Sequence, residues 1–362
     1  MTNTCLIDDL SRRGLLSGAE GSAIAARLGC RPLDREEPGA VRALQDDVAA
    51  AEPEEIASGV FFLKGATRYF QEGTVQGPAG AIRSLMCNNG WVVLGDYVLL
   101  IDANMPSRAD TLIDAVRRTT DKPIRFLLNT HHHGDHMYGN RAIFERTGAA
   151  IVACTGMIEE LRRYETGAFG GPPGRWEEVG KHRPDVAATP LMLPTQTFDD
   201  TMLLEGGGRR VELRHLGLGH TRGDAVAWLP EERVVFAGDL VTNGAFNIVR
   251  DSVMAPWIDT LSVMQALKPS VVCPGHGGRG DDVLLAHQRS FFVALLDEVK
   301  FRIQSCGSRD RVLGDLEAIR AALLADPTTA SFVIPREADL AVLSLRAQVE
   351  RVYDQMRSQN CL

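Results

Sequence analysis

A run of three histidines begins at His131 and is followed, after a glycine, by Asp135 and His136. Imidazole nitrogens and carboxylate oxygens are the usual ligands of catalytic zinc. His131 and His133 are two residues apart on an extended segment that leaves a strand, so their rings can point to the same side. Asp135 and His136 come where a loop turns into a helix, and they can supply a second group of ligands. This offset selects an H-x-H-x-D-H register and predicts that His132 points away.

Three further candidate ligands stand beside glycines at the ends of expected strands. His220 follows Gly219, His276 follows Gly275, and Asp239 ends an apolar strand after a glycine. Single histidines are weak evidence, but the same glycine-flanked context recurs around each of these loops. The remaining histidines lack that context and are interpreted as structural or surface residues: His182, His215 and His287.

The elements that must position these residues alternate between buried strands and amphipathic helices. The segment 124–128 is a short apolar strand that delivers the histidine run at its C-terminal end. The other expected strands are 60–63, 81–86, 91–94, 97–101, 149–153, 201–204, 210–216, 224–229, 233–237 and 270–273. The expected helices are 107–119, 140–147, 156–165, 257–267 and those from about 281 onward. Strands followed by strand–helix units, twice over, predict an α/β fold in which two sheets pack face to face with helices outside.

The four pieces H-x-H-x-D-H, G-H-T, G-D and G-H, in this order, resemble the metallo-β-lactamase superfamily over about residues 56–290. The resemblance implies an αββα four-layer sandwich, here with a C-terminal helical extension. It also implies a dinuclear centre whose ligands fall into three sets. The first site would use His131, His133 and His220, the second Asp135, His136 and His276, and Asp239 would bridge them.

Asp102, at the end of the strand 97–101, matches a family acid that supports the ligand loop without binding metal. It could equally be a cap at the strand end. Two Zn²⁺ ions are the expected cofactors, and iron or manganese would also suit these ligands.

The resemblance implies a hydrolase in which a hydroxide held between two zinc ions attacks a small-molecule ester, thioester, lactone or lactam. Asp135 is the expected catalytic residue, because it can orient the nucleophile or move its proton. Best-known class B β-lactamases place a cysteine where this chain has Asp239, and a lysine where it has Thr242. The full Asp/His set is more similar to glyoxalase II and the lactonases, so lactam hydrolysis is expected as a side activity.

Two other activities use the same scaffold. A mononuclear iron enzyme similar to the sulfur dioxygenases would keep comparable ligands and act as an oxidoreductase. A phosphodiesterase on the same fold would also share the metal ligands.

Two segments near the ligand loops, 166–180 and 243–257, could shape substrate choice. Their candidate pocket residues are Trp176, Phe246, Asn247 and Trp257. The alternative is that both tryptophans are core anchors, because aromatic side chains usually pack in the interior.

Composition limits the partners. Hydrophobic residues make up 44% of the chain, charged residues 24%, and the net charge is −8. A nucleic-acid backbone would meet unfavourable electrostatics, so we expect a small-molecule substrate and no nucleic acid. No apolar stretch approaches the roughly 20 residues of a membrane span. The chain has seven cysteines and no CxxC pair, which argues against a disulfide framework and against a zinc site built from cysteines.

The expected organisation has three parts: a tail at 1–50, a catalytic domain at 51–295 and a helical extension at 296–362. The extension would cover one side of the core, form a lid or make a homodimer. Ser11-Arg12-Arg13, with Ala23-Ile24-Ala25 after it, resembles a twin-arginine export signal. We expect a cytoplasmic location, with export by this route as the alternative.

Overall fold

The computed structural model describes residues 52–69, 82–165, 174–336 and 343–359. Contacts within the chain divide it into two compact units, Met1–Leu44 and Gln45–Leu362. All of the described residues belong to the second unit. The tail at 1–50 and its export-like motif lie outside the described residues, as does the segment 166–173 that was expected near the substrate.

The first sheet has seven strands in the order β1-β2-β5-β6-β7-β8-β9. They are β1 (Glu54–Ala57), β2 (Val60–Leu63), β5 (Asn89–Leu94), β6 (Tyr97–Ile101), β7 (Ile124–Leu128), β8 (Ala150–Cys154) and β9 (Gln196–Phe198). Pairing is antiparallel from β1 to β6 and parallel from β6 to β9. Because β6 and β7 are parallel, Asp102 and the histidine run emerge at the same edge of the sheet.

The second sheet has five strands in the order β10-β11-β12-β13-β14. They are β10 (Thr201–Gly206), β11 (Arg209–Arg214), β12 (Val226–Leu229), β13 (Val234–Thr242) and β14 (Val271–His276). Only β13 and β14 pair in parallel. Asp239 and His276 therefore lie near the same end of two neighbouring strands. A separate hairpin consists of β3 (Thr67–Tyr69) and β4 (Ile82–Leu85).

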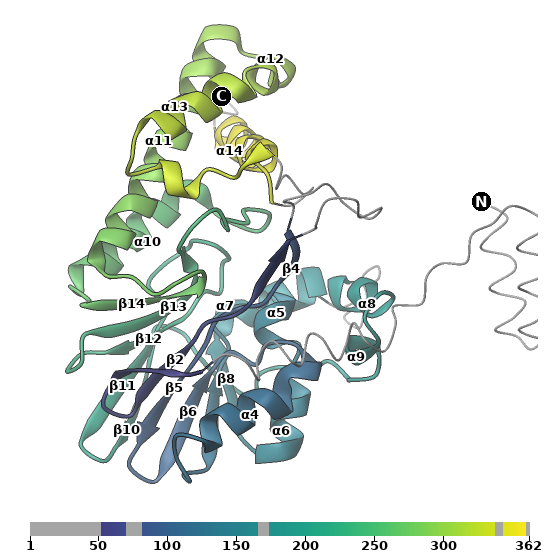
Figure 1. Cartoon of the computed structure of the whole chain (residues 1–362). Coiled ribbons are helices and arrows are strands. Elements are labelled where there is room, and N and C mark those ends of the chain that lie inside the picture. The colour runs from purple at the N-terminus through teal and green to yellow at the C-terminus, as the bar shows by residue number, and fades with distance from the viewer. Residues whose placement is uncertain (1–51, 70–81, 166–173, 337–342, 360–362) are drawn as a thin grey trace, which may run out of the picture. The chain divides into compact units, whose positions relative to one another are not determined.

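Helices cover the outer faces of both sheets (Figure 1). Those around the first sheet and the ligand loops are η1 (Pro106–Arg108), α4 (Ala109–Arg117), α5 (Gly134–Met137), α6 (Asn140–Thr147), α7 (Thr155–Glu160), the π-helix η2 (Leu161–Glu165), α8 (Arg175–Gly180) and α9 (Pro184–Ala187). The later ones are α10 (Met254–Ala266), α11 (Asp282–Cys306), α12 (Arg309–Gly314), α13 (Leu316–Ala325), η4 (Ala330–Phe332) and α14 (Leu345–Gln359).

The packing of the apolar residues confirms the four-layer αββα sandwich. One cluster joins Leu99 of the first sheet with Val211 and Phe236 of the second, so it fills the space between the sheets. In a second cluster, apolar residues of α4 and α6 pack against the outer face of the first sheet. A third joins the second sheet to α10–α14, with Trp257 and Phe292 at zero exposure. The expected C-terminal helices are present, and they share the core of the second sheet.

Several elements differ from the sequence expectation. The Gly/Pro-rich stretch before residue 200 contains α8, α9 and β9, and β13 continues past Asp239 to Thr242. The helix expected at 156–165 is split into α7 and the π-helix η2. Helix α11 runs without a break across residues 295 and 296, so the proposed boundary there stays a prediction.

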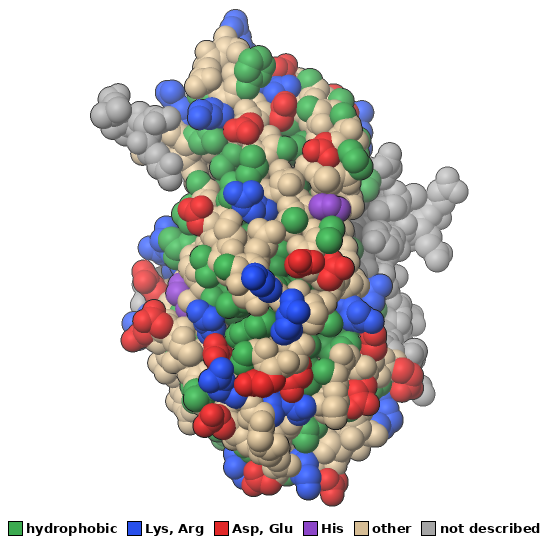
Figure 2. Space-filling view, turned by 90° about the vertical axis from the view of Figure 1, so that its left-hand side faces the viewer, with side chains coloured by type: hydrophobic (Ala, Val, Ile, Leu, Met, Phe, Trp, Pro, Cys, Tyr) green, Lys and Arg blue, Asp and Glu red, His purple; other side chains and the backbone are tan. Residues whose placement is uncertain are grey.

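Within the described part of the chain, no helix has the length and apolarity that crossing a membrane would need. Figure 2 shows acidic and basic side chains interspersed over one face of the molecule. On that face, as far as the structure describes it, the net negative charge of the chain is not gathered into a single patch.

Candidate metal centre

The predicted ligands come from loops, from strand ends and, for Asp239, from within a strand. His131 and His133 follow β7, and α5 begins at Gly134 directly after them. His220 lies in the connection between β11 and β12, while Asp239 lies within β13. His276 is the last residue of β14 and completes the set. The two sheets thus bring segments distant in sequence to a common point.

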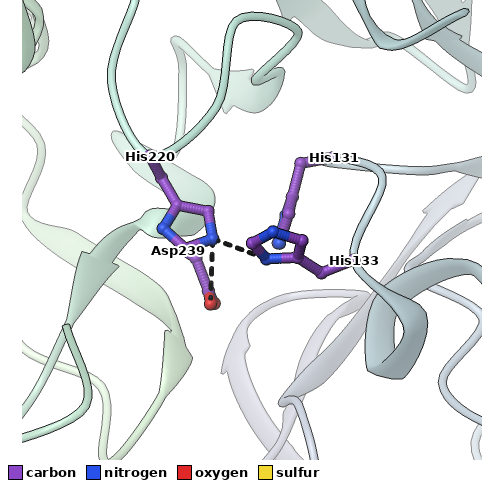
Figure 3. A group of neighbouring side chains, drawn as sticks. All are labelled: His131, His133, His220 and Asp239. Carbon is purple, nitrogen blue, oxygen red and sulfur yellow. Dashed lines mark hydrogen bonds and ion pairs between the residues drawn. The ribbon is translucent and has the colours of Figure 1, made fainter. Parts of the chain in front are cut away.

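His131, His133, His220 and Asp239 form the first group (Figure 3), and their potential ligand atoms all lie within 4.8 Å of one another. The Nε2 atom of His220 is 2.9 Å from Nδ1 of His133. It is also 3.6 Å from Oδ2 of Asp239. All four residues are buried. Two imidazole nitrogens thus lie close together beside a carboxylate. This set of ligand atoms suits a divalent metal ion.

Asp135, His136 and His276 form the second group, again with ligand atoms within 4.8 Å of one another. Nε2 of His276 is 3.3 Å from Oδ2 of Asp135, and Nε2 of His136 is 3.6 Å from the same oxygen. The Asp135 side chain is 22% exposed, whereas those of His136 and His276 are at 2% or less. Asp135 therefore combines contact with this group and access to solvent.

Asp239 lies between the two groups. Its Oδ1 is 3.3 Å from His136 Nε2, and its Oδ2 is 3.4 Å from His276 Nε2 and 3.6 Å from His220 Nε2. One carboxylate thus contacts histidines of both groups. This is the position that a bridging ligand requires.

Unsatisfied polar atoms provide a test of whether a cation fits. Buried polar atoms in folded proteins nearly always have a hydrogen-bond partner. Nε2 of His131, Nε2 of His136 and Oδ1 of Asp239 are buried and have no such partner among the described residues. Two imidazole nitrogens and one carboxylate oxygen, of the types that zinc prefers, are thus buried without a hydrogen bond, and this fits a bound ion.

The charge state of the centre is consistent with that fit. Burial lowers the pKa of His131 and His133 well below the usual histidine value, so these imidazoles are neutral and keep a lone pair for a ligand. Burial also opposes protonation of His276, but the carboxylates of Asp239 and Asp135 raise its pKa to about 9. The two carboxylates thus make the electrostatic potential at the second group strongly negative. A metal cation would take the place of the proton on His276.

Asp102 supports the second group from behind. Its Oδ2 lies 2.7 Å from Nδ1 of His136, and Oδ1 accepts the backbone N–H of Thr130 at 2.8 Å. The hydroxyl of Thr130 donates to Oδ2 at 2.9 Å. Since Nδ1 of His136 is held in this way, its Nε2 is left to face Asp239. Asp102 has a φ of 60°, a left-handed conformation that aspartate tolerates better than most residues.

Two glycines are required by close approach. A Cβ atom on Gly275 would lie 1.9 Å from Oδ1 of Asp239. Gly238 has a φ of 51°, and a Cβ there would lie 2.5 Å from the hydroxyl oxygen of Thr130. The glycines in the G-D and G-H motifs therefore leave room for the carboxylate and for the neighbouring loop.

The sequence did not reveal the acid that contacts His133. Asp251, in the connection between β13 and α10, has an Oδ2 atom 2.8 Å from Nε2 of His133. The same oxygen is 3.5 Å from Nε2 of His132, whose ring is fully buried and stacks 5.8 Å from that of Tyr164. No local motif marks Asp251, and only the tertiary fold brings it to the histidine run. His132 lies outside both groups around Asp239, but it is packed among polar side chains.

The four candidate pocket residues divide into two kinds. Trp257 and Asn247 are buried, with 0% and 1% exposure. Trp257 donates from Nε1 to the carbonyl of Leu240, and its ring lies edge-on to that of His220 with 5.6 Å between ring centres, so it supports the ligand loop from inside. The burial of Trp257 fits the alternative of a core anchor, and a role of these four residues in binding substrate stays a prediction. Phe246 is partly buried with its ring 6.2 Å from that of His276, and Trp176 packs partly buried against the α7 region.

Comparisons with known proteins point to one superfamily. The sequence model described as "Metallo-beta-lactamase superfamily" matches residues 83–276. A Metallo-beta-lactamase type 2 of Bacteroides fragilis is 25% identical over 209 residues, covering 56% of this chain and 74% of that protein. A Hydroxyacylglutathione hydrolase of Rhodobacter capsulatus is 26% identical, covering 50% of this chain and 57% of that protein.

An Atrochrysone carboxyl ACP thioesterase of Aspergillus fumigatus is 27% identical, covering 56% of this chain and 40% of that protein. Among solved structures, a metallo-beta-lactamase from Pontibacter korlensis superposes with a TM-score of 0.52 and 20% identity. That match covers 67% of this chain and 99% of the other, and it shows the shared fold. With the family model matching more than half of its residues, the chain belongs to the metallo-beta-lactamase superfamily.

Proposed function

We propose that this chain is a zinc-dependent hydrolase that binds two metal ions and cleaves a small-molecule ester, thioester, lactone or lactam. The observation that supports it most is Asp239, whose two oxygens lie 3.3–3.6 Å from histidines of both groups. Its named relatives are hydrolases that include a metallo-beta-lactamase, a hydroxyacylglutathione hydrolase and a thioesterase. The reaction common to these named enzymes is the attack of water on an acyl group.

His131, His133 and His220 would hold one ion, Asp135, His136 and His276 the other, and Asp239 would contact both. When bound, two such ions supply a water of lowered pKa and a Lewis acid for the carbonyl oxygen. The protein contributes the geometry: Asp102 fixes the ring of His136, and Asp251 fixes that of His133.

Asp135 is the residue with the access that catalysis needs. Its carboxylate is 22% exposed, while Asp239 is only 3% exposed. It can therefore orient the attacking water and carry its proton toward the leaving group. Asp239 in place of the lactamase cysteine favours esters, thioesters and lactones over β-lactams as the main substrates.

A substrate panel tests this function. The full chain loaded with zinc is given a carboxylic ester, an acyl thioester, a lactone, a β-lactam and a phosphodiester, and product release is measured. We expect turnover of at least one acyl substrate and none of the phosphodiester. Cleavage of the phosphodiester alone would contradict the proposal, as would oxygen consumption on a persulfide by an iron-loaded sample that hydrolyses no acyl substrate.

A pair of histidine variants controls for metal outside the site. His220→Ala removes a member of the first group, whereas His287→Ala changes a histidine of α11 that belongs to neither group. We expect the first variant to lose activity and the second to retain it. Equal activity in both variants would show that hydrolysis arises elsewhere.

A further inference from the structure

A buried polar network lies beside the histidine run and links Asp251, which contacts His133, to side chains that have no role in the chemistry described above. We call it the Arg175 network; its members are Tyr138, Glu165, Arg175 and Asp251. The side chains of Glu165 and Asp251 are 1% and 2% exposed, and that of Arg175 is 20% exposed. Burying a carboxylate costs free energy unless it is paired. Glu165 and Asp251 therefore need the partners that this network provides.

Arg175 binds Asp251 through two parallel contacts. Its Nη1 is 2.5 Å from Oδ2 and its Nη2 is 2.6 Å from Oδ1, which is the bidentate geometry of an arginine–carboxylate pair. Oδ2 of Asp251 also accepts from Nε2 of His133 at 2.8 Å. Because a carboxylate can only accept, the proton of His133 is on Nε2, and Nδ1 is left to face His220. The orientation of the carboxylate thus determines which nitrogen of His133 is offered as a ligand.

The same guanidinium also reaches the second ligand segment. Nη1 of Arg175 is 3.3 Å from Oε1 of Glu165, and Oε2 of Glu165 accepts the hydroxyl of Tyr138 at 2.5 Å. Tyr138 is the C-cap of α5, the helix that carries Asp135 and His136. One side chain on α8 therefore connects to ligand segments of both groups.

A second cation stands near Asp251 but has a different geometry. The Nε atom of Arg250 is 3.7 Å from Oδ2, and its side chain is 44% exposed. At that distance and exposure it contributes charge without fixing the plane of the carboxylate. The guanidinium of Arg175 is also 4.8 Å from the centre of the Tyr164 ring, which further restrains it.

We propose that Arg175 is a positioning residue of the metal centre: it fixes the Asp251 carboxylate so that His133 presents Nδ1 to the first ion. This rests on the proposed metal-dependent function. Arginine and lysine differ here, because lysine keeps the charge but cannot make the two parallel contacts. The distinction separates orientation of the carboxylate from simple neutralisation of it.

Zinc affinity of the full-length Arg175→Ala and Arg175→Lys variants, measured by competition with a chromophoric chelator, tests the proposal. Loss of a partner that orients a metal ligand typically costs about 10–100-fold in metal affinity. We expect a loss in that range for the tightest-bound ion in Arg175→Ala and a smaller loss in Arg175→Lys. The absorption spectrum of the cobalt-loaded variants should shift as well, because the angle of one ligand ring changes.

Arg209→Ala is a matched control. Arg209 is 18% exposed, pairs with Glu232 at 2.6 Å and donates to the carbonyl of Val93, but it lies on β11 and contacts no ligand. We expect it to lower the midpoint of unfolding with unchanged zinc affinity. If it weakens zinc binding as much as Arg175→Ala, the effect is general destabilisation and the proposal is wrong.

Three further outcomes are decisive. Zinc affinity equal to wild type in Arg175→Lys overturns the bidentate role, and this variant decides the matter if Arg175→Ala does not fold. Wild-type protein that binds no zinc would contradict the proposed function as well. Wild-type protein that binds zinc with both Arg175 variants unaffected contradicts the positioning role alone.

Discussion

The candidate centre depends on which ring nitrogen each histidine presents. His136 is bound through Nδ1 by Asp102, and His133 is bound through Nε2 by Asp251. The two neighbouring ligands thus offer opposite nitrogens, Nε2 and Nδ1. Each choice is imposed by a buried carboxylate, because hydrogen bonding at one nitrogen determines the tautomer.

Replacing Asp135 with asparagine tests its catalytic role. The change keeps the size of the side chain and one oxygen for a metal, but removes the proton acceptor. We expect zinc to remain bound while turnover falls by about 10²–10⁴-fold, the usual contribution of a general base. Metal analysis and kcat/KM on the same sample would show both effects.

Asp110→Asn is the control for this substitution, because Asp110 pairs with Arg146 on the surface and touches no ligand. It should leave turnover within about twofold of wild type, as surface changes usually do. An Asp135→Asn variant with full turnover would refute the assigned role.

At this scale, the sequence predicted the residues that carry a local motif. His131, His133 and Asp135 are fixed by a spacing of two, and His276 by its glycine neighbours. Asp251 and Arg175 have no such pattern, because they reach the site only when the β13–α10 connection and α8 fold over the histidine run. The sequence left two roles open for Trp257, pocket residue and core anchor, because neighbourhood along the chain does not show which way a side chain is buried.

Parallel pairing of β13 and β14 is the element-level cause of the bridging geometry. Gly238 pairs with Pro274, and Thr242 pairs with His276. Gly275 then crosses close to Asp239, with no space for a side chain between them. The strand pair and its glycines together fix the carboxylate that both groups share.

Gly275→Ala tests this contact. The added Cβ would lie 1.9 Å from Oδ1 of Asp239, so the carboxylate or the strand must move. We expect at least a tenfold loss of zinc affinity and a parallel loss of hydrolysis. Zinc competition on the full chain provides the measurement.

Gly314→Ala is the companion variant, since a Cβ at Gly314 would meet nothing within 4 Å. Its zinc binding should equal that of wild type. Unchanged zinc binding in Gly275→Ala would mean that Asp239 does not need its observed position.

Helix α10 supports the His220 loop through Trp257. This side chain has no exposure, its ring centre is 4.4 Å from that of Phe292, and its Nε1 donates to Leu240. Trp257→Ala should lower the free energy of unfolding by about 3–5 kcal/mol, the usual cost of deleting a buried aromatic ring. Urea denaturation measures the loss.

Phe301→Ala on α11 provides the comparison, because Phe301 is 64% exposed. It should change the free energy of unfolding by less than about 0.5 kcal/mol. Equal losses in the two variants would contradict the role of Trp257 as an internal brace.

The elements predicted with the correct bounds include a strand that is a short apolar run and a helix that is largely polar. The strand 124–128 and the helix 140–147 have the bounds that the sequence indicated. Elements α8, α9 and β9 were missed, because elements of three to six residues are too short to show a periodicity. The position of α8 depends on tertiary contacts, such as those of Arg175 with Glu165 and Asp251, which no local pattern encodes.

For the whole catalytic unit, the four layers explain how the centre is assembled. One sheet supplies His131, His133, Asp135 and His136, and the other supplies His220, Asp239 and His276. The packing of the two sheets through Leu99, Val211 and Phe236 therefore sets the distance between ligands from opposite halves. The sequence predicted this architecture, because its order of strands and helices repeats twice.

Titration of the metal-free full chain with zinc, with bound zinc counted by native mass spectrometry and acyl hydrolysis followed in the same samples, tests the central claim most directly. We expect hydrolysis to rise until about two zinc ions are bound, and the midpoint of thermal unfolding to rise with it. Zinc at 100 times its dissociation constant would stabilise the fold by about 2.7 kcal/mol. A chain that binds no zinc, or whose acyl hydrolysis is the same with and without it, would contradict the account.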